Sequence, residues 1–164
     1  MPHRTRKQYL PEPMIGFLDY WVERMGQSGP PIRNADFSPN ALKPWLGHLA
    51  LIERGEDGDL RFRLAGTKLL KRFGQELTGK SFRDIDDVVL GDLEKVVMEA
   101  MAMAAPVVQH VVLADERQKF HDLLAPLANV DGQVNLVILI SYPELVTPIV
   151  AEAREGRVQS SDLS

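Results

Sequence analysis

Two histidines, His110 and His121, carry side chains that can bind a metal or exchange protons near neutral pH. They lie on the two arms of a predicted β-hairpin. Counting inward from a turn centred between residues 116 and 117 places Leu123 opposite His110 and Val112 opposite His121. The two histidines are therefore expected to meet at best diagonally across the strands.

A metal held by this pair would need a third ligand, from Asp115 or Asp122. Strand alternation points Asp122 to the face opposite His121, so the pattern does not predict a metal site. We expect the histidines to be structural or to face solvent. His110 is kept as a polar contact in a cavity because Val108 shares its face.

Two arginines, Arg61 and Arg63, leave one face of a predicted strand. With Arg33 or Lys68 they could bind a carboxylate or phosphate. The alternative is structural: the arginines protect an edge strand by solvated charge, or one of them pairs with Asp36 and fastens the preceding linker to the sheet. The structural interpretation is favoured.

A basic cluster, Lys68, Lys71 and Arg72, is interpreted as the solvated face of a short helix. Acidic residues between positions 53 and 59 are close in sequence and are expected to cancel part of its field.

Three clustered carboxylates, Asp84, Asp86 and Asp87, could suggest metal binding or acid–base chemistry, but helix capping explains them more simply. Asp86 and Asp87 are expected to begin one long helix that runs to residue 104.

The elements that position these side chains fit one domain. The chain has 164 residues, of which 45% are hydrophobic, and a net charge of −4, so nucleic-acid binding is disfavoured. It contains no cysteine, which excludes disulfides and fits a reducing cytoplasm. No apolar run approaches the roughly 20 residues needed to cross a bilayer, so we expect no membrane insertion.

We expect a flexible N-terminus at residues 1–11, a single domain at 12–142 and a C-terminal helix and tail at 143–164. The domain includes a leading amphipathic helix at residues 12–28.

Hydrophobic periodicity and turn residues predict five strands, at residues 48–53, 60–64, 107–113, 119–128 and 134–142. The last strand is apolar without alternation from Leu136 to Ile140, so it should be covered on both faces and lie at the centre. This predicts an α+β fold with a five-stranded antiparallel sheet in the order 2-1-5-4-3. Helices between the strand groups would cover one face, and the leading helix is available for the other.

The residues that carry a family resemblance are LRFRLAGT at 60–67 followed by LTGK at 77–80. The pairs and runs YW at 20–21, GPPIR at 29–33, Asp36, Pro39 and Gly74 add to it. Over roughly residues 15–142 the chain resembles a family of short bacterial PAS-like proteins. The resemblance implies the PAS fold and a stand-alone sensory or signalling module, and it implies no particular chemistry.

The cofactors of other PAS branches can be compared with this sequence. Light-oxygen-voltage flavin sensors and coumaric acid photosensors need a cysteine, which the chain lacks. Haem sensors commonly use a histidine on the long helix, where this chain has only Met98, Met101 and Met103. Cysteine-linked chromophores are therefore excluded, haem is not expected, and the cofactor is unknown.

The first functional hypothesis is a cytoplasmic sensory module that holds a small apolar or amphipathic ligand between the sheet and the long helix, with no catalytic activity of its own. The residues expected to face this cavity are Phe62, Leu64, Phe73, Phe82, Val97, Met101, His110 and Ile138.

The second hypothesis is a ligandless interaction module. The leading helix carries Phe17, Tyr20 and Trp21, which could pack on the open sheet face or on a partner. We favour a homodimer through this helix, with an unidentified signalling protein as a further partner.

The third hypothesis is a small α+β enzyme with His121 and Asp122 as acid–base groups. No nucleophile elbow, metal motif or phosphate loop in the sequence supports it, so we expect the protein not to be an enzyme.

Overall fold

A computed structural model of the chain describes residues 10–28, 40–113 and 118–144. Arg33, Asp36 and the C-terminal helix predicted after residue 143 lie outside the described residues, as does most of the N-terminus predicted to be flexible.

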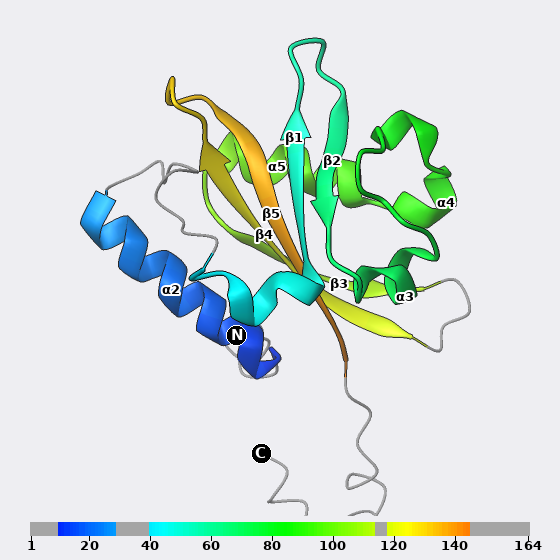
Figure 1. Cartoon of the computed structure of the whole chain (residues 1–164), viewed down its shortest axis with the longest axis horizontal. Helices are drawn as coiled ribbons and strands as arrows, with labels where there is room; N and C mark the ends of the chain where they lie inside the picture. Colours follow the sequence, from blue (N-terminus) through cyan, green and yellow to red (C-terminus); the bar gives the residue numbers. More distant parts are fainter. Residues whose placement is uncertain (1–9, 29–39, 114–117, 145–164) are drawn as a thin grey trace, which may run out of the picture.

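The centre of the structure is one antiparallel sheet of five strands in the order β2-β1-β5-β4-β3 (Figure 1). This confirms the predicted topology. The strands are β1 (Leu49–Arg54), β2 (Leu60–Ala65), β3 (Val107–Val112), β4 (Lys119–Ala128) and β5 (Val134–Pro143).

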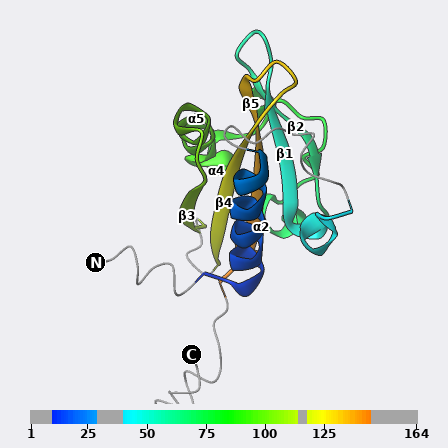
Figure 2. The ribbon, with the colours of Figure 1, turned by 90° about the vertical axis from the view of Figure 1, so that its left-hand side faces the viewer.

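Helices lie on both faces of this sheet, and Figure 2 shows α2 running along it. They are α2 (Glu12–Ser28), the 3-10 helix η2 (Lys43–His48), α3 (Leu69–Phe73), the 3-10 helix η3 (Phe82–Asp84), α4 (Asp87–Leu90) and α5 (Leu93–Met103). The segment from α3 to α5 belongs to one face, and α2 with η2 covers the other.

The central strand, β5, pairs with β1 on one side and with β4 on the other. Its residues from Leu136 to Ile140 are all buried, and they alternate between the two hydrophobic cores. Both faces of β5 must be apolar because each face is covered, so the missing alternation predicted its position correctly.

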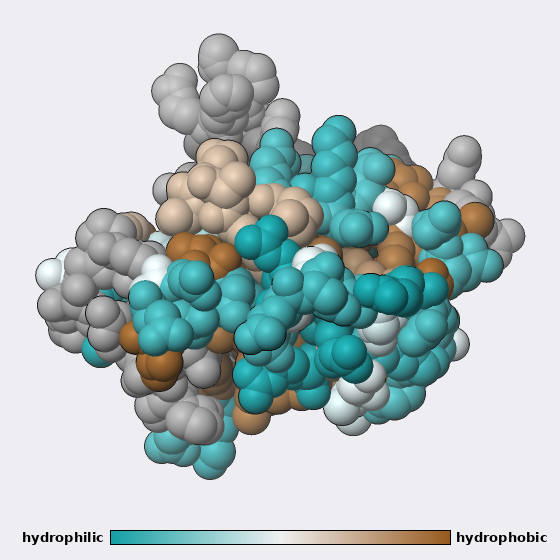
Figure 3. All heavy atoms as spheres, turned by 90° about the horizontal axis from the view of Figure 1, so that it is seen from above, coloured by the Kyte–Doolittle hydropathy of each residue, from teal (hydrophilic) through white to brown (hydrophobic). Residues whose placement is uncertain are grey.

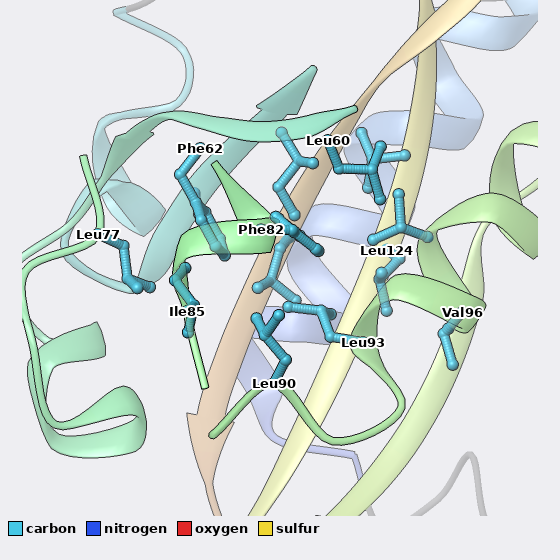
Figure 4. Packing of buried hydrophobic residues seen from close by; sticks show 14 of the residues in the cluster. Leu60, Phe62, Leu77, Phe82, Ile85, Leu90, Leu93, Val96 and Leu124 are labelled. Carbon is cyan, nitrogen blue, oxygen red and sulfur yellow. The ribbon is translucent and has the colours of Figure 1, made fainter. Parts of the chain in front are cut away.

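On the α5 side of the sheet, aromatic rings fill the space beneath the helices. Phe62 stacks on Phe82 with ring centroids 4.8 Å apart and meets Phe73 edge-on at 6.0 Å. Figure 4 shows Leu90 and Leu93 among the aliphatic side chains that complete this cluster. The cluster ties α3, η3, α4 and α5 to β1 and β2.

On the opposite face, α2 packs against its own sheet. Phe17 is 0% exposed and Trp21 is 3% exposed, and both belong to a cluster with Leu123 and Ile138. Trp45 of η2 donates a hydrogen bond from Nε1 to the Pro13 carbonyl at 2.7 Å, which joins η2 to α2. Phe17 and Trp21 are therefore not available as a dimer surface, contrary to the favoured interpretation of this helix, because they supply the core of this face.

The predicted helix from residue 87 to 104 is two helices. Asp86 accepts a hydrogen bond from the Val88 backbone N–H and caps α4, as its position suggested. Gly91 then adopts φ +57°, a conformation that ends the helix after one turn, and α5 begins at Leu93.

The turn between β1 and β2 lies at the end of the sheet away from η2 and α3 (Figure 1). Viewed from that end, hydrophilic side chains gather across the middle of the surface (Figure 3). Among the described residues, no helix has both the length and the apolar composition to cross a membrane.

Candidate functional site

Five of the predicted cavity residues lie together on the α5 side. Their side chains are buried in one hydrophobic cluster in which they pack with the rest of the core: Phe62, Phe73, Phe82, Val97 and Met101. The space between the sheet and α5 is thus occupied by side chains at these positions.

The other three predicted cavity residues lie elsewhere. Ile138 is buried on the α2 face, because alternation along β5 places it opposite to Val137 and Leu139. Leu64 is 42% exposed, and His110 is exposed on β3. The prediction that these three line a cavity under the long helix is wrong.

A β-bulge explains the error at Leu64. Phe62 pairs with Ile52 and Leu64 pairs with Leu51, so Arg63 is an extra residue in β2. One extra residue reverses the inside–outside alternation of the strand beyond it. Leu64 therefore lies on the face opposite to Phe62, which a strict period of two could not predict.

A pocket of about 540 Å³ opens at the end of the sheet beside α3. It is lined by residues from η2, from the start of α3, from the start of β4 and from the end of β5: His48, Thr67, Lys68, Leu69, Lys71, Arg72, Gln118, Lys119, Phe120, Ser141, Pro143 and Glu144. Four of these are Lys or Arg and one is Glu, so the lining is mainly cationic.

Gly66 brings η2 and α3 close enough to form this pocket. A Cβ atom on Gly66 would lie 2.2 Å from the Leu46 carbonyl oxygen, so only glycine fits there. The Lys68 backbone N–H then donates to the Gly47 carbonyl at 2.9 Å. The glycine within the LRFRLAGT segment thus sets the position of Lys68, Lys71 and Arg72.

Arg72 lines the pocket as a buried residue and is not part of a solvated helix face. Its Nη1 donates to Asp122 Oδ1 at 2.5 Å and to Ser141 Oγ at 2.9 Å. Its guanidinium carbon lies 4.6 Å from the centroid of the Phe73 ring and 5.5 Å from that of Phe120. The side chain is buried because an ion pair and two rings compensate for its lost hydration.

The partner of Arg72 is held in place as well. Asp122 is 0% exposed, and its Oδ2 accepts a hydrogen bond from Gln109 Nε2 at 2.9 Å. Sequence reasoning missed this network. The available signal was Asp122 itself, because a carboxylate in the middle of an apolar strand requires a buried cationic partner.

His48 also lines the pocket. Its Nδ1 lies 3.1 Å from the Ser141 carbonyl, and its ring stacks on Tyr142 with centroids 3.9 Å apart. Burial lowers the pKa of His48, the Ser141 carbonyl opposes this shift, and the charge of Lys68 adds to it. Burial also raises the pKa of Tyr142.

The acidic residues expected to weaken the basic cluster are too far away to do so. They lie in and beside the β1–β2 turn, at the other end of strands that are six residues long. Six extended residues span about 20 Å, more than twice the roughly 8 Å Debye length at physiological salt.

Arg61 and Arg63 are both exposed and lie away from the pocket. Arg63 Nε lies 3.7 Å from Glu53 Oε1 on the neighbouring strand, and Arg61 forms an isolated β-bridge with Ser81. The segment around Ser81 covers the outer edge of β2. The proposed Asp36 partner lies outside the described residues.

A second polar group of residues lies on the other face of the sheet. His110 pairs directly with His121, and their ring centroids are 4.4 Å apart. The predicted diagonal register is wrong: β3 and β4 pair with His110 opposite His121, two positions from the expected partner Leu123, and the Leu113 N–H donates to the Gln118 carbonyl. His121 and Asp122 do point to opposite faces, as alternation predicted.

Glu144 completes this second group. Its Oε1 lies 3.7 Å from His121 Nε2, and its backbone N–H donates to the Lys119 carbonyl at 2.8 Å. His121 is 3% exposed, and its Nδ1 has no hydrogen-bond partner in the described part of the chain. Burial and the nearby His110 lower the pKa of His121, while Glu144 and Asp122 oppose the shift.

The fold and the matched sequence together define the class of protein: the PAS domain family matches residues 11–140, and the chain belongs to this family.

The similar solved structures include the PAS domain of histidine kinase ThkA, which is 22% identical, with 57% of this chain and 97% of that chain covered. A sensory box sensor histidine kinase from Vibrio cholerae is 17% identical, with 69% and 100% covered. A light-oxygen-voltage domain studied with a flavin analogue is 17% identical, with 76% and 94% covered. The TM-score is 0.44 in each case. A comparison with curated proteins gives no significant match.

Proposed function

We propose that this PAS domain is a sensory module that binds a small anionic ligand in the pocket beside α3. The observation that supports this most strongly is the cationic lining around the buried Arg72. Lys68, Lys71 and Lys119 reach the same space from two different elements. Cations that converge on a concave site attract carboxylates and phosphates.

The apolar lining residues and the volume of the pocket indicate what else the ligand should contain. Leu69, Phe120 and Pro143 give the pocket an apolar portion next to its charged rim. A volume of about 540 Å³ is within the range of small-molecule sites. The favoured ligand is therefore a small organic acid or phosphate ester with an apolar part.

The proposed role is recognition without catalysis. Arg72 lines the pocket and is hydrogen-bonded to Asp122 on β4 and to Ser141 on β5. An anionic ligand that binds the guanidinium would compete with these two hydrogen bonds. Ligand binding would thereby change the contacts between α3 and the sheet. A signalling protein that contacts the domain would then receive the change.

The test is a thermal-shift and calorimetric titration of the full chain with inorganic phosphate, benzoate and, as a cationic comparison, benzylamine. At 100 times its Kd a bound ligand stabilises the fold by about 2.7 kcal/mol, so an anion should raise the unfolding midpoint by several degrees. The Lys68→Gln/Lys71→Gln variant should lose this response.

Lys95→Gln is the matched control, because Lys95 is exposed on α5 and does not line the pocket. An equal response to benzoate and benzylamine, or an unchanged response in the double lysine variant, would contradict the anion pocket.

The packed interior favours a second candidate, an interaction module without a ligand. Phe62, Phe73 and Val97 are in one continuous cluster at the place where an internal ligand was predicted. Light scattering of the full chain over a hundredfold concentration range tests self-association. A mass that rises toward that of a dimer would support this candidate, and a constant monomer mass would contradict the homodimer.

A further inference from the structure

We propose that His110, His121 and Glu144 form a binding site for a divalent transition-metal ion of the zinc type. One ligand atom from each of these residues lies within 4.8 Å of the others. Two come from β3 and β4 and the third directly follows β5, so the sheet brings together residues that are 11 and 23 positions apart in the chain.

The sheet also orients the three side chains toward one face. His110 and His121 are directly paired across β3 and β4, and His121 is paired with Tyr142 on β5. Glu144 is two residues beyond Tyr142, which places it on the same side of an extended chain. Its backbone N–H bonds to the Lys119 carbonyl, which continues the β4–β5 hydrogen-bond ladder and fixes the position of the Glu144 backbone. The site is therefore positioned by backbone pairing.

The distances are close to those that a metal requires. Zinc binds histidine nitrogen and carboxylate oxygen at about 2.0–2.2 Å in a tetrahedron, which puts ligand atoms roughly 3.3–3.5 Å apart. His121 Nε2 and Glu144 Oε1 are 3.7 Å apart. His110 and Glu144 are exposed, so changes of side-chain rotamer can bring their ligand atoms to the distances that zinc requires.

An ion pair between His121 and Glu144 is the simpler explanation of their proximity. The 3.7 Å separation of His121 Nε2 and Glu144 Oε1 is longer than a hydrogen bond. An ion pair also leaves His110 without a role, although its ligand atom lies within 4.8 Å of those of His121 and Glu144. A metal ion would use all three side chains.

The residue types select the class of ion. Two imidazoles and one carboxylate suit zinc, cobalt or nickel, whereas calcium and magnesium prefer sites made of oxygen alone. Three protein ligands leave a further coordination position for water or for an anion. Glu144 also lines the pocket beside α3, but the metal site rests on its own geometry and not on the proposed anion binding.

The test uses the full chain without an affinity tag, freed of metal by a chelator and dialysed. Zinc binding is measured by calorimetry, and cobalt binding by its visible absorption, which reports coordination number. We expect one equivalent of metal to bind and a cobalt spectrum of a four- or five-coordinate site.

His110→Ala and Glu144→Gln should each weaken zinc binding by at least the roughly 10–100-fold that loss of even an outer-shell partner causes. Both residues are exposed, so the variants are expected to fold, which circular dichroism verifies. Glu94→Gln, on the exposed side of α5, is the matched control and should bind zinc like the natural chain.

Absence of binding in the natural chain, or binding that both ligand variants retain, would overturn the proposal. Retained binding would place the metal elsewhere, for example at His3. The Lys68→Gln/Lys71→Gln variant separates the two proposals, because it should bind zinc normally whether or not the anion pocket exists.

Discussion

Two neighbouring residues of β4, His121 and Asp122, lie at the centres of two polar clusters on opposite faces of the same sheet. Asp122 is enclosed: both of its carboxylate oxygens accept hydrogen bonds, from Arg72 and from Gln109. His121 is buried to nearly the same degree, yet its Nδ1 lacks a partner and its nearest acid, Glu144, is 3.7 Å away. One cluster is completed by hydrogen bonds within the chain, and the other is the one for which we propose a metal ion.

The difference follows from charge. A buried carboxylate is always a costly charge at neutral pH, so the fold must supply its cation. A buried imidazole can avoid that cost by staying neutral, and the fold then tolerates an incomplete set of partners. Complete hydrogen bonding on the Asp122 side thus indicates a structural role, whereas on the His121 side it is Nε2, facing Glu144, that the proposed metal ion would use.

The largest expected effect tests the face of the sheet that His121 shares with α2. Replacing Phe17 and Trp21 together by Ala removes two buried rings from this core, at about 3–5 kcal/mol each. The sum is similar to the whole stability of many domains, so we expect little cooperative unfolding to remain in urea.

Val22→Ala is the control on the same helix, because Val22 is 62% exposed and its loss should change the free energy of unfolding by less than about 0.5 kcal/mol. If the double Ala variant folded normally and only lost a dimer, the helix would pack on a partner and not on its own sheet.

The second effect tests whether the Asp122 cluster is closed. Asp122→Ala leaves Arg72 buried without its counter-charge, so the free energy of unfolding should fall by about 3–5 kcal/mol, as measured by urea denaturation.

Removing both charges, in Arg72→Met/Asp122→Leu, should cost less than removing Asp122 alone, because no unpaired charge remains. A double variant that is less stable than Asp122→Ala would mean that the ion pair contributes more than its desolvation costs.

The amino-acid sequence predicted the apolar part of this molecule well and its polar clusters poorly. Strand order, the central position of β5 and the turn between β1 and β2 depend on hydrophobic patterns and on glycine, which are local signals. Arg72 and Asp122 are 50 residues apart, so their pairing depends on how α3 lies against β4. Nothing local in either segment specifies that placement.

Two local irregularities account for the errors at Leu64 and at the histidine pair. The bulge at Arg63 reversed the direction of Leu64, and a different pairing of β3 with β4 brought His110 opposite His121. The first inserts a single residue and the second moves the pairing by two positions, and either change gives the later side chains new partners. The candidate metal site depended on that shift, and its third ligand follows the last predicted strand.

A smaller effect is expected from His48, which faces the Ser141 carbonyl, the Tyr142 ring and Lys68. Its pKa is lower in the folded chain than the ordinary value of 6.5, so the unfolded chain takes up a proton first as the pH falls. The free energy of unfolding should therefore decrease as the pH drops below about 6.5.

In His48→Gln the decrease between pH 7 and pH 5.5 should be smaller, as measured by urea denaturation at each pH. An unchanged or steeper pH dependence in this variant would show that His48 is not held in its neutral form by the fold.

The smallest effect contrasts the buried ion pair of Arg72 with an exposed one. Arg63 and Glu53 are 3.7 Å apart at their closest charged atoms, and both side chains are well exposed to water. Solvent screening and side-chain entropy reduce the contribution of such a pair to the free energy of unfolding to about 0–1 kcal/mol. Arg63→Gln should therefore barely change urea denaturation.

Because Arg63 also lies outside the pocket, the variant should keep any response to benzoate. A loss of stability as large as that of Asp122→Ala would show that exposure does not separate these two ion pairs, and a lost benzoate response would return the anion site to β2.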